Sequence, residues 1–362
     1  MTDTTVKYLY SSMGGAPVLS GQAGKLIDVL DACLINGWGV VNVDQIVVSS
    51  NVAVATINAG HYAEVDTVVK IAGSGQSGLN GEHRATAKTN STVTFSTSGV
   101  ADGTYTGAVT LKIAPAGWEK AFSATNKAAY RCPDMTASRC LLRIDDTATT
   151  YARASGFGEM TTVDAGTNRF PTDAQLSGGG YFYKSNAADA SARNWWVIAT
   201  DRFFYIGISY NGSYQAYGGG EVYAFGDFPS RKNADVYPCV IFPGTATPWG
   251  PGGSSPIADS QLQGYLARST DQATVSHLAY PAWLRRPGSV DVSSGRGSMT
   301  YPNPCDDALL VTPEFLFEGT TILRGMLPGV YASEQAVNAA YAMGAKLTGV
   351  IPNRTLVAQR TA

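Results

Sequence analysis

Hydrophobic and polar residues alternate along most of this chain in short runs separated by Gly, Asn and Ser turns. Val109, Leu111 and Ile113, for example, are separated by single polar residues, which is the pattern of a strand with one buried face. Two such runs on either side of a short Ser/Asn turn predict a β-hairpin over residues 45–57. The strands predicted for this first region are 45–48, 52–57, 65–71, 82–88, 92–96 and 107–113.

The same sequence of strands and turns continues after residue 118 with many more aromatic residues. Asp145-Asp146-Thr147 and Asp201-Arg202 are expected to be hairpin turns, with the carboxylates of the first turn in solvent. A short helix is expected near 333–343. The strands predicted for this second region are 140–144, 151–154, 179–183, 195–199, 203–209, 221–225, 236–242, 309–312, 315–318, 321–323, 346–351 and 355–358.

One amphipathic helix is predicted near the start of the chain. Apolar residues recur at helical spacing over residues 26–34, and this spacing gives the helix one apolar face. Ser20 is the expected N-terminal cap, and Asn36-Gly37 is expected to end the helix. The polar residues expected to point away from the core are Lys25, Asp28 and Asp31.

Together these patterns predict a mainly β, multi-domain protein with short antiparallel strands in sandwich- or barrel-like modules and one N-terminal helix. We expect a first domain at 1–117, with the helix and a small β-module, and a larger aromatic-rich domain at 118–362. A Pro/Gly/Ser-rich loop at 243–256 lies within the second domain. Residues 13–17 are rich in Gly and Pro, which is typical of a loop, although an arm on a neighbouring subunit stays open.

Composition narrows the function. Charged residues make up 15% of the 362 residues and the net charge is −2, so no basic surface for nucleic acid is expected. No apolar run is long enough to cross a membrane, and the N-terminus lacks the pattern of a signal peptide. Low charge with 40 Gly and 19 Tyr favours turn-rich β-structure with surfaces that are covered by partners.

No catalytic or metal-binding pattern stands out among the reactive residues. The three histidines, His61, His83 and His277, lack a ligand spacing, so no metal and no cofactor are expected. The Gly-rich residues 73–78 lack the Lys-Ser/Thr ending of a phosphate loop. Adjacent carboxylates at 145–146 and 306–307 do not face each other as a glycosidase pair must. The five cysteines, expected to be free thiols, are Cys33, Cys132, Cys140, Cys239 and Cys305.

Aromatic residues between positions 195 and 217 are the most suggestive feature. Alternation places neighbouring side chains on opposite faces of a sheet, so one face fills the core and the other needs a cover. That cover is a second layer, a partner subunit or a stacked glycan, and all three stay open. The candidate interface or ligand residues are Trp195, Trp196, Tyr205, Tyr210, Tyr214 and Tyr217.

A set of short blocks lies in a fixed order along the chain: 12–21, 30–39, 59–61, 69–71, 79–81, 94–95, 142–146, 152–153, 223–227 and 323–331. Together these blocks resemble structural proteins of tailed bacteriophages, including a small β-module that recurs in phage tail and particle proteins. The resemblance implies virion assembly and supplies no catalytic residues.

The function expected from this resemblance is that of a non-enzymatic component of the virion, made in the host cytoplasm. It would act in multiple symmetric copies through protein–protein contacts with capsid or tail proteins, as a head decoration or as part of the tail or tail tip. The first alternative is a receptor- or carbohydrate-binding module that uses the aromatics near 195–217 to bind a host-surface glycan. An enzyme that degrades glycans is the second alternative.

Overall fold

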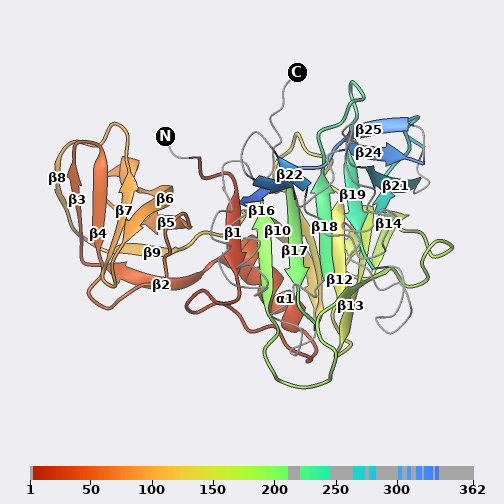
Figure 1. The fold of residues 1–362 in the computed structure, drawn as a ribbon, viewed down its shortest axis with the longest axis horizontal. Helices are drawn as coiled ribbons and strands as arrows, with labels where there is room; N and C mark the ends of the chain where they lie inside the picture. Colours follow the sequence, from red (N-terminus) through yellow and green to blue (C-terminus); the bar gives the residue numbers. More distant parts are fainter. Residues whose placement is uncertain are drawn as a thin grey trace.

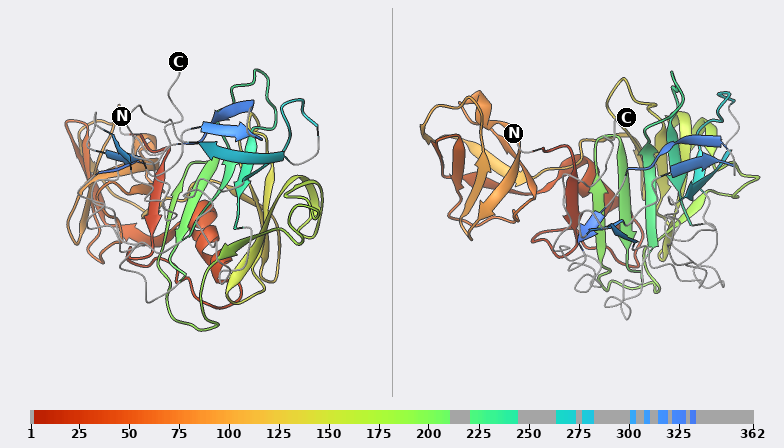
Figure 2. Two further views of the ribbon diagram at one scale, coloured as in Figure 1. Left: turned by 45° about the vertical axis from the view of Figure 1, so that its right-hand side comes forward. Right: turned by 45° about the horizontal axis from the view of Figure 1, so that its top comes forward.

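The structure is a computed structural model that describes residues 3–210, 221–244, 264–273, 277–282, 301–303, 308–310, 315–319, 322–328 and 331–333. Strands dominate these residues, and every strand pairing among them is antiparallel. Two lobes are visible in Figures 1 and 2: a small β-module and a larger β-sandwich, called the body below. The predicted mainly β fold with one short N-terminal helix is confirmed.

The module is a curled sheet whose eight described strands run in the order β2-β9-β5-β6-β7-β4-β3-β8. The predicted hairpin of β3 and β4 turns at Ser50 and Asn51, both of which have positive φ (52° and 63°), as the tight two-residue hairpin turn requires. The strands are β2 (Trp38–Val43), β3 (Gln45–Ser49), β4 (Val52–Thr56), β5 (Val68–Ala72), β6 (Gly81–Lys88), β7 (Thr92–Ser96), β8 (Gly103–Tyr105) and β9 (Val109–Ile113), with a 3₁₀ turn at Ser77–Leu79.

The body contains two larger sheets. In the described part of the chain, one sheet has nine strands in the order β1-β16-β17-β18-β19-β20-β21-β24-β25, and the other follows β10-β11-β12-β13-β14 with β15 added beside β13. Its strands are β1 (Lys7–Tyr10), β10 (Glu119–Ala124), β11 (Lys127–Arg131), β12 (Leu141–Asp145), β13 (Tyr151–Thr162), β14 (Ala165–Phe170), β15 (Gly180–Tyr183), β16 (Trp195–Ala199), β17 (Phe203–Ile208), β18 (Glu221–Asp227), β19 (Cys239–Phe242), β20 (Gly264–Leu266), β21 (His277–Ala282), β24 (Phe315–Glu318) and β25 (Ile322–Met326).

A third, small sheet joins β22 (Tyr301–Asn303), β23 (Ala308–Leu310) and β26 (Tyr331–Ser333). Of the late predicted strands, those near 309–312, 315–318 and 321–323 overlap β23, β24 and β25. The predicted helix at 333–343 and the predicted strands at 346–351 and 355–358 lie outside the described residues, apart from Ser333 at the end of β26. The Pro/Gly/Ser-rich loop at 243–256 also lies almost wholly outside them.

The N-terminal helix differs from its prediction at the cap. Helix α1 (Lys25–Leu30) continues as a π-helical turn over Asp31–Asn36, and Ser20 makes no capping bond to it. The carboxylate of Asp146 caps the helix instead, accepting hydrogen bonds from the amides of Leu26 (2.7 Å) and Ile27 (3.3 Å). The prediction that Asp31 points to solvent is also wrong, because Asp31 pairs with Lys120 and accepts a bond from Tyr130 (2.8 Å).

β1 pairs with a strand of the body, and helix α1 is held by residues of the six-stranded sheet. β1 pairs with β16 from Lys7↔Ala199 to Tyr10↔Trp196, and the contacts of Asp31 and Asp146 tie α1 to the six-stranded sheet. The structure therefore groups the first residues of the chain with the body, and the strands of the module run from β2 to β9. The division into domains at 1–117 and 118–362 stays a prediction; the pairing partners of β1 lie far away in the sequence.

Candidate functional site

Three of the six aromatic residues proposed from the sequence, Trp195, Trp196 and Tyr205, are core residues. Trp195 and Tyr205 have no exposed surface and Trp196 is 9% exposed. The indole of Trp195 donates to the carbonyl of Pro17 (3.1 Å), and the Tyr205 hydroxyl donates to the carbonyl of Pro328 (2.5 Å). Every residue of β16 and β17 is buried, so both faces of these strands are covered within the chain and the second-layer interpretation holds for them.

The other three proposed aromatics do not join these residues in a described site. Tyr210 is partly buried against the core, and its carbonyl accepts hydrogen bonds from Arg193 (3.1 Å) and from the amide of Asn186 (2.8 Å). Tyr214 and Tyr217 lie outside the described residues. The structure therefore does not bring the six candidates together as an exposed aromatic platform in the part of the chain that it describes.

The turn at Asp145-Asp146 is not solvated as expected. Asp146 has no exposed surface and pairs with Lys184, which is equally buried. The Lys184 ammonium also donates to the carbonyl of Gln22 (2.7 Å). Burial raises the pKa of Asp146 to about 6, against the opposing effects of the Lys184 ammonium and of the two capping amides. The Asp146–Lys184 pair connects helix α1 and the segment before it with the ends of β12 and β15, so its role is structural.

The described residues hold no group of three or more His, Cys, Asp or Glu side chains that is placed to bind a metal ion. The ring of His83 lies against Phe95, with 4.4 Å between the ring centroids, and its Nε2 bonds to the carbonyl of Leu79 (2.9 Å). Four of the five predicted free thiols are seen free and buried, namely Cys33, Cys132, Cys140 and Cys239. Within the described residues, no helix is both long and apolar enough to span a membrane.

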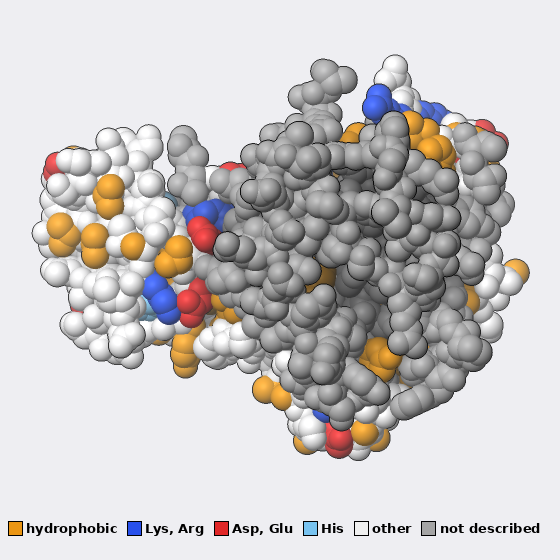
Figure 3. Space-filling view, in the orientation of Figure 1, with side chains coloured by type: hydrophobic (Ala, Val, Ile, Leu, Met, Phe, Trp, Pro, Cys, Tyr) orange, Lys and Arg blue, Asp and Glu red, His pale blue; other side chains and the backbone are white. Residues whose placement is uncertain are grey.

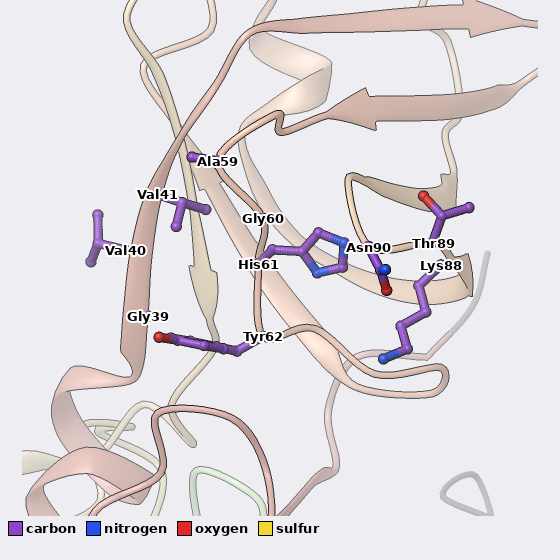
Figure 4. Close-up of a pocket in the computed structure, with 10 residues that line it drawn as sticks. All are labelled: Gly39, Val40, Val41, Ala59, Gly60, His61, Tyr62, Lys88, Thr89 and Asn90. Atoms are coloured by element: carbon purple, nitrogen blue, oxygen red, sulfur yellow. The ribbon is translucent and has the colours of Figure 1, made fainter.

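A pocket of about 420 Å³ lies on the module, between β2, the segment after β4 and the turn between β6 and β7. Figure 4 shows that Tyr62 reaches from this segment toward Gly39 on β2, whereas His61 reaches the other way toward Asn90. The pocket therefore has an apolar end with Tyr62 and a polar end with Asn90. The lining residues are Gly39, Val40, Val41, Ala59, Gly60, His61, Tyr62, Lys88, Thr89 and Asn90.

His61 fixes the shape of this pocket. One ring nitrogen, Nδ1, accepts from the amide of Ala63 (3.1 Å), and the other, Nε2, lies 3.1 Å from the carbonyl of Thr92. Because Nδ1 accepts, Nε2 carries the proton and donates to Thr92. Both nitrogens are occupied by the backbone, so His61 positions the loop and leaves the pocket chemistry to its neighbours.

Tyr62 lies against a glycine-rich loop of the body. A Cβ atom built on Gly14 would lie 2.4 Å from the ring, one on Gly15 2.6 Å and one on Gly39 2.7 Å. Only residues without a side chain allow this approach, so the Gly14-Gly15 pair serves as a seat for Tyr62. Tyr62 as a residue nevertheless stays 46% exposed. The sequence shows the three glycines, but it does not show that the ring packed against them is that of Tyr62.

Further contacts fasten the module to the N-terminal segment. The buried Arg84 of β6 donates to the carbonyls of Asp3 (2.8 Å) and Val6 (3.1 Å). Lys7 of β1, also buried, pairs with Glu82 of β6 (2.6 Å). These contacts and the seat of Tyr62 are called the latch below. Because β1 is paired with β16 in the body, the latch fixes the position of the module relative to the body.

On the outer face of the module, three rows of cross-strand neighbours contain no charged residue. These three rows are called the neutral face below. Its inward-pointing neighbours, such as Ile46, Ala53 and Phe95, are fully buried, so these rows point outward. In Figure 3 the visible side of the module has hydrophobic side chains on a mostly white surface, with a few charged side chains toward its edges. The rows are Thr104–Val47–Val54–Thr94–Ala87, then Ser49–Val52–Ser96, and Gln45–Thr56–Thr92.

Comparison of the chain with family models, with curated proteins and with solved structures finds no match in any of the three.

Proposed function

We propose that this protein is a non-enzymatic structural component of a tailed-phage virion, present in several copies on the head exterior or in the tail apparatus. The observation that carries the proposal is the neutral face on a latched, projecting module. The blocks of sequence that resemble phage particle proteins give the proposal its biological setting.

The chemistry of the neutral face suits docking against another protein. Val47 and Val52 are 38% and 42% exposed, and their cross-strand neighbours are Thr104 and Val54 for Val47, and Ser49 and Ser96 for Val52. Covering such a face removes apolar area from water at roughly 25 cal/mol per Å². It also avoids the desolvation of ions, which costs several kcal/mol for each buried charge.

The latch supports the same function. A module on a free linker loses orientational freedom whenever it docks, and this loss opposes binding. Arg84 and the Lys7–Glu82 pair hold the module in place before any partner arrives. Repeated copies of the protein would therefore present their neutral faces at a fixed angle, as a closed symmetric assembly requires.

A charge placed on the neutral face tests this role. Val47→Lys puts an ammonium into the longest row, between Thr104 and Val54, and a buried unpaired charge weakens docking by about 3–5 kcal/mol. Val18→Lys is the matched control, because Val18 is a body residue that is 56% exposed. We expect Val47→Lys to fold normally and to lose association in sedimentation velocity, both alone and with isolated particles.

The Val18→Lys variant should associate as the unmodified chain does. If the unmodified protein neither self-associates nor joins particles at any concentration, or if Val47→Lys associates as strongly as Val18→Lys, the neutral face is not the docking surface.

A further inference from the structure

We propose that the pocket beside Tyr62 binds a neutral saccharide. The pocket would do so whether or not the protein is part of a particle, since every residue that lines the pocket belongs to the module and the Gly14-Gly15 seat of Tyr62 belongs to the same chain. This site is separate from the buried aromatics of β16 and β17, which the sequence had suggested for glycan contact.

The charge of the lining selects an uncharged ligand. Lys88 is the one charged residue that lines the pocket, and its ammonium pairs with Glu64 (3.0 Å). His61 is held by two backbone groups. An anion would therefore meet an ammonium that is already paired, and a cation would meet no carboxylate among the lining residues.

The arrangement of apolar and polar groups selects a ligand that has both kinds of surface. Tyr62 is 46% exposed and lies at one end of the pocket, where the side chain of Val41 points into the pocket and that of Val40 points away from it. At the other end, no described residue pairs with the exposed side-chain amide of Asn90. A sugar ring has C–H groups that pack on an aromatic ring and hydroxyls that bond to an amide, so it matches both ends.

The volume also fits a small ligand. Pockets for small molecules measure roughly 300–1,000 Å³ and combine apolar walls with a few polar groups, and this pocket holds about 420 Å³. The seat on Gly14 and Gly15 sets the position of the Tyr62 ring before any ligand binds. Because the ring is already held in place, it loses little conformational freedom on binding. A neutral ligand binds weakly, so its binding free energy must not be reduced further by such a loss.

A glycan array with the full chain, followed by ligand-observed NMR with the saccharides that bind, tests the proposal. We expect Tyr62→Ala to weaken binding about tenfold, from the loss of ring stacking. Asn90→Ala removes an exposed side chain without a described protein partner, so it should fold normally and still weaken binding several-fold. Val47→Ala, on the neutral face, is the control and should leave binding unchanged.

Saccharide binding that both pocket variants weaken and the control does not supports the proposal. Three results would overturn it: no saccharide bound by the unmodified chain at millimolar concentration, binding that survives both Tyr62→Ala and Asn90→Ala, or a pocket that binds extended peptides and no saccharide. Loss of association in the Val47→Lys variant with saccharide binding intact would separate this site from the docking function.

Discussion

Replacing Asp146 by alanine should destabilise the body of the protein strongly. Asp146 has no exposed surface, and its two oxygens serve Lys184 and the amides of Leu26 and Ile27. The substitution leaves the ammonium of Lys184 buried with only the carbonyl of Gln22 as a described acceptor. Removing one partner of a buried ion pair costs about 3–5 kcal/mol, a large part of the roughly 5–15 kcal/mol that holds a domain folded.

Urea unfolding at pH 8, followed by tryptophan fluorescence, measures this loss. At this pH Asp146 is ionised, since its pKa is raised only to about 6. With a slope of roughly 2–3 kcal/mol per M, the midpoint should fall by about 1–2.5 M. Trp118 and Trp195 are both buried in the body, so their emission reports on the part that the substitution affects.

Asp28→Ala is the matched control. Asp28 lies on the same helix and pairs with Lys25 (2.8 Å), but its side chain is 52% exposed, and such surface pairs contribute about 0–1 kcal/mol. Replacing both Asp146 by Leu and Lys184 by Met should cost less than either single change, because no unpaired charge remains. A loss below about 1 kcal/mol for Asp146→Ala, equal to that of Asp28→Ala, would refute the assignment of this buried pair as a fastening point.

Three further outcomes are expected. Burial lowers the pKa of His83 below its ordinary value, so the unfolded chain binds the proton more tightly than the folded chain. The stability of the module should therefore fall as pH drops below about 6.5, and His83→Gln should remove this fall in acid titrations. Gly15→Ala should lower the unfolding midpoint, because φ is 68° there and a Cβ would meet Tyr62, with strain of about 1–2 kcal/mol. Burial raises the pKa of the Cys33 thiol and that of Cys132, the latter to about 11, so iodoacetamide should label neither in the native protein and both in urea, as peptide mass spectrometry would detect.

The sequence predicted the elements of the module well because their signal is local. The predicted strand at 92–96 is β7 without any shift, and the hairpin of β3 and β4 falls within its predicted range. Each depends on a two-residue alternation and on turn residues that lie next to one another in the chain. Such patterns can be recognised without knowing which distant strands pair with them.

Contacts between distant residues could not be predicted in the same way. The cap of α1 comes from Asp146, which lies 120 residues from Leu26, and an exposed turn was the natural interpretation of Asp145-Asp146-Thr147. The seat of Tyr62 joins two segments that only the folded chain brings together.

For the aromatic strands β16 and β17, the sequence does contain a signal of burial on both faces. β16 reads Trp-Trp-Val-Ile-Ala and β17 reads Phe-Phe-Tyr-Ile-Gly-Ile. Continuous apolar runs of this kind are typical of strands buried on both faces. That pattern indicates a sheet covered on both faces, as the burial of Trp195 and Trp196 shows, whereas the alternation of side chains had left a second layer, a partner subunit and a stacked glycan open.

The most direct test of the proposed function is quantitative mass spectrometry of density-purified virus particles, separated into heads and tails, from the culture that produces this protein. The proposal predicts that the chain co-purifies with one of these fractions at a constant, multi-copy ratio to the major particle protein. Absence of the chain from intact particles, with the protein left entirely in the unassembled fraction, would contradict it.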